Sequence, residues 1–125
     1  MIIKVPFKTP SVNHLYGQRG FRKYLTKEAK KLREEIDKIV KSHPYSDKQD
    51  LKDKPLKVVV YLYEDWYCLN GSVKRVDVDN RAKFLLDSVF NALGIDDRHI
   101  FELTMIKTTS LNDNENHAII EIEPL

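Results

Sequence analysis

The stretch Leu-Lys-Val-Val-Val-Tyr-Leu-Tyr at residues 56–63 is the feature that most constrains the fold. β-Branched and aromatic residues favour a strand, and this run is apolar enough to lie in the centre of a sheet. It is far shorter than the roughly 20 apolar residues that a membrane-spanning helix needs, and no longer apolar run occurs in the chain. The sequence therefore predicts a sheet built around this strand and no membrane span.

Two amphipathic helices are predicted on either side of that strand in the sequence. The first covers residues 27–42, with Thr26 as its N-cap, and the second covers about residues 79–93, with Gly94 as its C-cap. Apolar residues recur at spacings of three and four in both segments, which gives each helix one buried face. The second helix takes its buried face from Ala82, Leu85, Leu86, Val89, Phe90 and Leu93.

The remaining segments complete a single domain. Residues 2–7 are expected to form a strand, with Pro6 tolerated only at an edge or an end. Residues 18–25 are expected to form a strand or an extended arm, and residues 44–55 a mobile polar loop. Residues 99–108 and 117–123 are expected to pair as a hairpin through Asn112-Asp113-Asn114. The order of elements predicts an α+β (α/β-like) domain over residues 1–125, with a mixed sheet and two helices packed on it.

Charge is divided unevenly along the 125 residues. Residues 1–76 carry 17 Lys and Arg against 9 Asp and Glu, whereas residues 77–125 carry 4 against 10. A basic half favours contact with a polyanion, and bound divalent cations would explain an acidic half. Two ordinary solvated faces would give the same distribution, so charge alone leaves both interpretations open.

Paired carboxylates at the start of the second helix are the strongest chemical feature. Asp77 and Asp79 would point to the same side if this stretch is extended, and a divalent cation would relieve their repulsion. Ligands that are all oxygen favour magnesium or manganese over zinc. Asp97 follows the turn at Gly94, where a strand starting nearby would bring it to the same cluster, and Lys83 lies one helical turn after Asp79.

Structural explanations exist for each of these residues. Asp77 or Asp79 would serve as a helix cap, Asp96 and Asp97 as a turn, and Asp79 with Lys83 as a surface ion pair. No Gly-rich phosphate loop and no Cys or His set with zinc spacing is present. The single cysteine, Cys68, is expected to act as a small hydrophobic residue in a reducing cytoplasm.

The block from Asp77 to Asp97 closely resembles the RusA family of Holliday junction resolvases. The family pattern D-x-D-N-x-x-K stands here as Asp77-Val78-Asp79-Asn80-Arg81-Ala82-Lys83, followed by an amphipathic helix and then by Gly94-Ile95-Asp96-Asp97. The opening from Pro6 through Pro10-Ser11-Val12-Asn13-His14-Leu15-Tyr16 is similar to the family's proline-rich start, although less specifically. The resemblance spans most of the chain.

This resemblance implies a magnesium-dependent endonuclease that cuts four-way DNA junctions as a homodimer, with Mn²⁺ as a substitute for Mg²⁺. The metal ligands would be Asp77, Asp79 and Asp97, and the catalytic lysine Lys83. Basic residues would grip DNA phosphates; the candidates are Arg19, Arg22, Lys23, Lys27, Lys30, Lys74 and Arg75. The basic run before the first aspartate is reduced to Lys74-Arg75 here, which leaves junction selectivity open.

Three other functions are compatible with these residues. One is a module that binds branched DNA without cutting it, and a second is a less selective metal-dependent nuclease. The third is a non-enzymatic protein stabilised by a metal. Cleavage that requires magnesium separates the first and third from an enzyme, and a linear DNA control separates the second.

Overall fold

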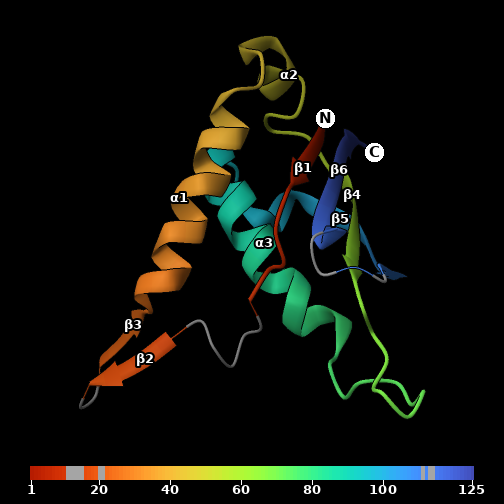
Figure 1. The fold of residues 1–125 in the computed structure, drawn as a ribbon. Helices are drawn as coiled ribbons and strands as arrows, with labels where there is room; N and C mark the ends of the chain where they lie inside the picture. Colours follow the sequence, from red (N-terminus) through yellow and green to blue (C-terminus); the bar gives the residue numbers. More distant parts are fainter. Residues whose placement is uncertain (11–15, 20–21, 111, 113–114) are drawn as a thin grey trace.

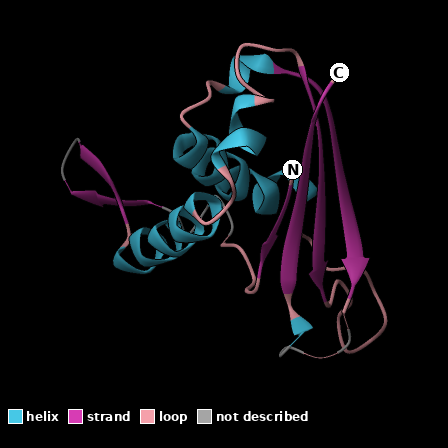
Figure 2. Cartoon of the chain, turned by 90° about the horizontal axis from the view of Figure 1, so that it is seen from above, coloured by secondary structure: helices cyan, strands magenta, loops and turns pink. Residues whose placement is uncertain are grey.

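The computed structural model describes residues 1–10, 16–19, 22–110, 112 and 115–125, with the backbone only for residues 16–19 and 22–25. Two layers are visible, a four-stranded sheet and a layer of helices on one of its faces (Figure 1, Figure 2). The elements are β1 (Ile2–Val5), β2 (Tyr16–Arg19), β3 (Arg22–Leu25), α1 (Lys27–Lys41), α2 (Tyr45–Gln49), β4 (Leu56–Glu64), α3 (Val78–Leu93), the 3₁₀ helix η2 (Asp97–His99), β5 (Ile100–Thr109) and β6 (His117–Pro124). This arrangement confirms the predicted α+β class with a mixed sheet.

Strand β4 lies inside the sheet, as its composition predicts. The strand order is β1-β6-β4-β5, in which β4 pairs parallel with β5 and antiparallel with β6. One face of β4 is fully buried and the other is partly buried. The backbone groups of β4 are thus hydrogen-bonded on both edges, and its side chains are at least partly buried on both faces, as is typical of an interior strand.

The predicted hairpin between residues 99–108 and 117–123 is wrong. β5 and β6 exist as strands, but β4 lies between them and pairs with both. β4, α3 and β5 form a β-α-β crossover unit, which requires parallel strands on either side of a helix. Of the turn predicted to close the hairpin, residues 113 and 114 lie outside the described part of the chain.

Helices α1 and α3 cover the same face of the sheet (Figure 2). Ile36 and Val40 of α1 and Phe84 and Leu85 of α3 are fully buried, and they join the inward-facing residues of the strands in one core. The predicted caps are confirmed: Thr26 Oγ1 accepts a hydrogen bond from the Ala29 amide at 3.2 Å, and Gly94 ends α3 in the left-handed region at φ 69°. That conformation strains any residue with a Cβ.

The peripheral segments differ more from expectation. Residues 18–25 contribute to an antiparallel pair, β2 and β3, which is separate from the main sheet. Residues 44–55, predicted as a loop, contain the five-residue helix α2. None of the α2 side chains is buried, so no apolar periodicity was present to reveal it. Strand β1 ends immediately before Pro6 and lies at an edge of the sheet, as the proline requires.

Candidate active site

The start of α3 presents two exposed carboxylates. Asp77 occupies the N-cap position in an extended conformation, but its side chain makes no capping hydrogen bond. Asp79, in the first turn, accepts a hydrogen bond from the Asn80 amide at 3.1 Å. The capping explanation therefore does not account for the Asp77 side chain, which is left exposed at a helix N-terminus.

Asp79 and Lys83 face a groove of about 570 Å³ between α3 and β5. One wall comes from α3, and the other comes from the residues at the start of β5 together with Asp97. The lining residues are Asp79, Asn80, Lys83, Leu86, Asp87, Asp97, Ile100, Phe101, Leu103 and Met105. Three of the four predicted catalytic residues, Asp79, Lys83 and Asp97, therefore line one groove.

The adjacent residues Asp96 and Asp97 have different surroundings. Asp96 is the N-cap of η2, and its carboxylate accepts a hydrogen bond from the Arg98 amide at 2.9 Å. This hydrogen bond is the main cause that lowers the pKa of Asp96 below its ordinary value. Asp96 thus has the structural role expected of a turn residue, whereas Asp97 lines the groove.

Two observations show that the described residues of one chain do not form a complete metal site. Asp77 is not among the residues that line it. Across the described residues, no group of three Asp, Glu, His or Cys side chains is close enough to hold a metal ion. Within one described chain, the predicted aspartates therefore provide two carboxylates in the groove and a third outside it.

The third structural explanation, a surface ion pair between Asp79 and Lys83, is not what the structure shows. Among the described side chains, ion pairs join Lys8 to Glu64, Lys41 to Asp37, and Arg81 to Glu64. Lys83 is exposed and directed into the groove with Asp79. Its ammonium is thus not paired with the carboxylate one turn before it.

Glu64 and Arg81 tie the start of α3 to the end of β4. The Glu64 side chain is 6% exposed and its Oε1 lies 3.5 Å from Nε of Arg81, with Lys8 Nζ at 3.8 Å on the same oxygen. Nε of Arg81 is buried and makes no hydrogen bond, so the contact with Glu64 is electrostatic. Burial raises the pKa of Glu64 above its ordinary value of 4.5, and the nearby cations, Arg81 foremost, oppose this shift.

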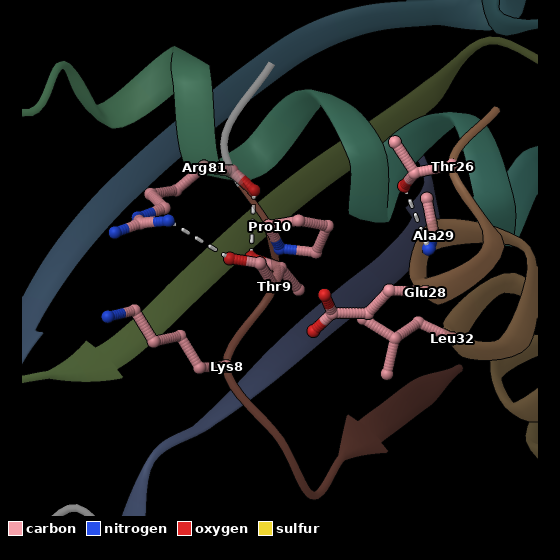
Figure 3. Close-up of a pocket in the computed structure, with 8 residues that line it drawn as sticks. All are labelled: Lys8, Thr9, Pro10, Thr26, Glu28, Ala29, Leu32 and Arg81. Atoms are coloured by element: carbon pink, nitrogen blue, oxygen red, sulfur yellow. Dashed lines mark hydrogen bonds between the residues drawn. The ribbon is translucent and has the colours of Figure 1, made fainter. Parts of the chain in front are cut away.

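Thr9 connects the same arginine to the N-terminal segment. Its hydroxyl donates to the Arg81 carbonyl at 2.9 Å, and Arg81 Nη1 donates to the Thr9 carbonyl at 3.4 Å (Figure 3). The cavity drawn there has a volume of about 260 Å³ and includes none of the four predicted catalytic residues. The two hydrogen bonds between Thr9 and Arg81 connect the N-terminal segment to the start of α3.

Lys107 and Lys74 hold the segment that leads into Asp77. Lys107 Nζ donates to the Val76 carbonyl and lies 4.8 Å from the centre of the Trp66 ring. Lys74 Nζ donates to the Asp65 carbonyl at 2.9 Å. Glu64, Arg81 and Lys107 were not identified from the sequence. The one available signal was the charged residue Glu64 directly after the apolar run of β4.

The predicted DNA-binding residues fall into three groups. Lys27 and Lys30 are exposed on the first turns of α1, and Arg75 is exposed just before α3. Lys74 is half-buried and already donates to the backbone. The side chains of Arg19, Arg22 and Lys23 lie outside the described part of the chain, as do residues 11–15 of the predicted family opening.

No helix in the described ranges has the length and apolar character needed to cross a membrane.

Comparison with known proteins gave no match to a curated protein. Two similar solved structures are of the periplasmic domain of Helicobacter pylori MotB. The structure of MotB residues 97–256 has a TM-score of 0.43 and 17% sequence identity to this chain, and the alignment covers 98% of this chain and 79% of that one. The structure of MotB residues 90–256 has a TM-score of 0.41 and 16% sequence identity, and the alignment covers 98% of this chain and 73% of that one. Both scores are too low to bear on fold or function.

The family comparison covers nearly the whole chain. The family model described as Endodeoxyribonuclease RusA matches residues 6–123. This match includes the start of α3, the groove and Asp97, and it agrees with the sequence pattern from Asp77 to Asp97. The chain belongs to the RusA family of endodeoxyribonucleases, which are Holliday junction resolvases.

Proposed function

We propose that this chain is a metal-dependent endonuclease that cuts branched DNA, with four-way junctions as its substrate. The observation that carries this proposal is the shared groove of Asp79, Lys83 and Asp97 in a member of a nuclease family. A chain that only bound DNA would have no need to gather carboxylates in a groove, because carboxylates repel the DNA backbone. A cation bound by those carboxylates would turn the repulsion into attraction.

The donor set of the groove fits magnesium or manganese. The groove is lined by three carboxylates, those of Asp79, Asp87 and Asp97, and by the amide of Asn80. Hard cations prefer oxygen ligands of this kind. Asp77 and Asp79 of one copy would hold the cation with Asp97 of a second copy, because the described residues of one chain bring no three such groups close enough together. Once bound, such a cation supplies an activated water and stabilises the charge that develops on the phosphate.

Lys83 has a separate role in the proposed reaction. It lies one helical turn after Asp79 on the groove side of α3, and no described carboxylate pairs with it. Its ammonium would bind a non-bridging oxygen of the scissile phosphate and stabilise the negative charge that grows there. A lysine at this position acts through its charge, so an uncharged side chain of equal length would not replace it.

The incomplete carboxylate set supports a homodimer. β5 is an edge strand of ten residues whose Phe101 is 69% exposed and whose Leu103 is 41% exposed. Long apolar edge strands tend to be covered by another chain. If two copies paired antiparallel along β5, the start of one β5 would lie beside the end of the other.

That pairing would complete the proposed metal site. Asp97 lies just before the start of β5, whereas Lys107 near its end bonds to Val76, the residue before Asp77. A twofold pairing would therefore bring Asp97 of one copy toward Asp77 and Asp79 of the other. Two such sites in one dimer match the need to nick a junction once on each of two strands.

The substrate is tested with a labelled synthetic four-way junction and a linear duplex of the same arm sequence. We expect magnesium-dependent cleavage of the junction, with paired nicks at symmetric positions, and no cleavage when EDTA is present. The linear duplex is the control and should stay intact at the same protein concentration. Equal cutting of both DNAs would show a less selective nuclease, and binding without cutting would show a module that has lost catalysis.

A further inference from the structure

Residues 66–74, between β4 and α3, form a small protruding hairpin with an apolar tip. Figure 1 shows this connection extending beyond the ends of β4 and α3 that it joins. Leu69 is 111% exposed, Val73 62% and Tyr67 47%. Three large apolar side chains gathered on one short protrusion are unfavourable in water unless they contact a partner. We refer to residues 66–74 below as the apolar hairpin.

The apolar hairpin is internally ordered by hydrogen bonds. Its two sides are joined by the Tyr67–Val73 bridge, by the Cys68 amide donating to the Ser72 carbonyl at 2.7 Å, and by the Lys74 amide donating to the Trp66 carbonyl at 2.8 Å. These contacts fix the tip before it meets any partner, so little conformational entropy is lost on binding.

A tight turn places Leu69 at the end of the apolar hairpin. The Gly71 amide donates to the Cys68 carbonyl at 2.9 Å, and Gly71 has the positive φ of 84° that favours glycine. Asn70 Oδ1 accepts from both the amide and the hydroxyl of Ser72, at 3.0 and 2.6 Å. The turn therefore holds Leu69 outward in one position.

The base of the apolar hairpin is anchored to the sheet. Trp66 is 3% exposed and its Nε1 donates to the Thr108 carbonyl at 3.1 Å. Lys74 Nζ donates to the Asp65 carbonyl, as described above. The base of the apolar hairpin is thus held in place by hydrogen bonds to β5 and to the residue that follows β4.

We propose that the apolar hairpin is a wedge that contacts the exposed base faces at the branch point of the DNA substrate. This inference rests on the proposed function, because it assigns the surface that recognises the branch. Val73 is followed by the basic pair Lys74-Arg75 and then, after Val76, by Asp77. In the sequence, the tip is therefore close to the exposed cation of Arg75, which would attract a phosphate, and to the proposed ligand Asp77.

Branched DNA is the partner that fits both the apolar tip and the charges beside it. At a branch point the base pairs lack a stacking neighbour on one side and present an apolar face. In a linear duplex every such face is covered, and separating a base step costs a few kcal/mol. Leu69 and Val73 would gain apolar contact with a branch and not with a duplex, so the wedge would select the branch.

The test compares Leu69→Ser with Leu125→Ser, which replaces another exposed leucine (69% exposed) that lies outside the apolar hairpin. Binding to the four-way junction and to the linear duplex is measured in EDTA, so that no DNA is cut. We expect Leu69→Ser to weaken junction binding by about tenfold, the effect of removing one buried leucine contact, and to leave duplex binding within about twofold. Leu125→Ser should leave both affinities unchanged.

A second measurement reports on the DNA itself. A 2-aminopurine placed at the branch point should change its fluorescence when the native chain binds, because Leu69 would lie against its exposed face, and should not do so with Leu69→Ser. Equal loss of junction and duplex binding, or no loss of either, would overturn the wedge. A native chain without any preference for junctions would overturn the proposed function and the wedge together. A change of oligomeric state in Leu69→Ser, seen by sedimentation, would instead make the tip an interface between copies.

Discussion

Asp79→Asn should lower the rate of junction cleavage by about a thousandfold, the effect of losing roughly 4 kcal/mol of transition-state stabilisation. Asparagine keeps the size of the side chain and one oxygen, but it removes the charge that holds a divalent cation. Binding to the junction should persist or strengthen, because a negative charge near the DNA phosphate is removed. Rates are measured with the protein in excess over labelled junction, so that product release does not limit them.

The matched control for this change is Asp87→Asn. Asp87 lines the same groove on the same helix, two turns after Asp79, and is not one of the proposed ligands. Its replacement should change the cleavage rate by less than about threefold, the size of a screened surface-charge effect. Full activity of Asp79→Asn would remove it from the ligand set. An equal loss in both variants would mean that the charge of the groove matters and the individual ligands do not.

Arg81→Met should destabilise the folded chain by about 3 kcal/mol, as expected when one partner of a buried ion pair is removed. Methionine retains much of the apolar stem, so the loss comes mainly from the charge. Glu64, whose side chain is 6% exposed, loses its nearest cation, and the hydrogen bond from Arg81 Nη1 to Thr9 is lost as well. The free energy of unfolding is measured by urea denaturation.

The pH dependence of this loss identifies Glu64 as its cause. Burial raises the pKa of Glu64 above 4.5 even with Arg81 present, and removing Arg81 raises that pKa further. For an acid with a raised folded pKa, stability is greatest below the unfolded pKa and falls as the pH rises through the folded pKa. The deficit of Arg81→Met relative to the native chain should therefore be small near pH 4.5 and largest at neutral pH.

The double variant Glu64→Gln/Arg81→Met provides the control. Without a carboxylate to leave unpaired, it should recover part of the stability at neutral pH and lose the pH dependence. A deficit that is the same at every pH, or a double variant less stable than Arg81→Met at neutral pH, would show that the ion pair is not the source of the effect.

Local patterns in the sequence were enough to predict the main elements. The structure confirms the predictions that depend only on neighbours within a few residues. These are the strand at residues 56–63, the buried faces of the two helices, Thr26 as an N-cap and Gly94 as a C-cap. The fold class followed from their order.

Strand pairing and the short helix were not predicted because they depend on distant residues or leave little trace. β5 and β6 are neighbours in sequence, which favours a hairpin, but both pair with β4 instead. The apolar character of β4 on both faces was the available clue. Helix α2 buries none of its side chains, so its sequence has no apolar residues recurring at helical spacing.

The candidate site was predicted in part. Helical spacing predicted Asp79 and Lys83 on one face, and the structure places Asp97 in the same groove. The supporting contacts of Glu64, Arg81 and Lys107 join segments far apart in the sequence, and spacing within one element gives no information about them. The roles of the aspartates and the metal remain predictions from the family pattern and from the chemistry of the groove.

Mixing two inactive variants tests the central claim most directly, namely that each catalytic site combines Asp79 of one copy with Asp97 of the other. Chains carrying Asp79→Asn and Asp97→Asn are given different tags, produced together, and purified as the mixed dimer. One of its two sites then has both native aspartates, and the other has neither. The mixed dimer should cut the junction in magnesium at roughly half the native rate, because a twofold dimer has two equivalent sites. Each variant alone should be inactive. A mixed dimer as inactive as its parents would contradict the shared site, since two sites built within single chains would each retain one defect.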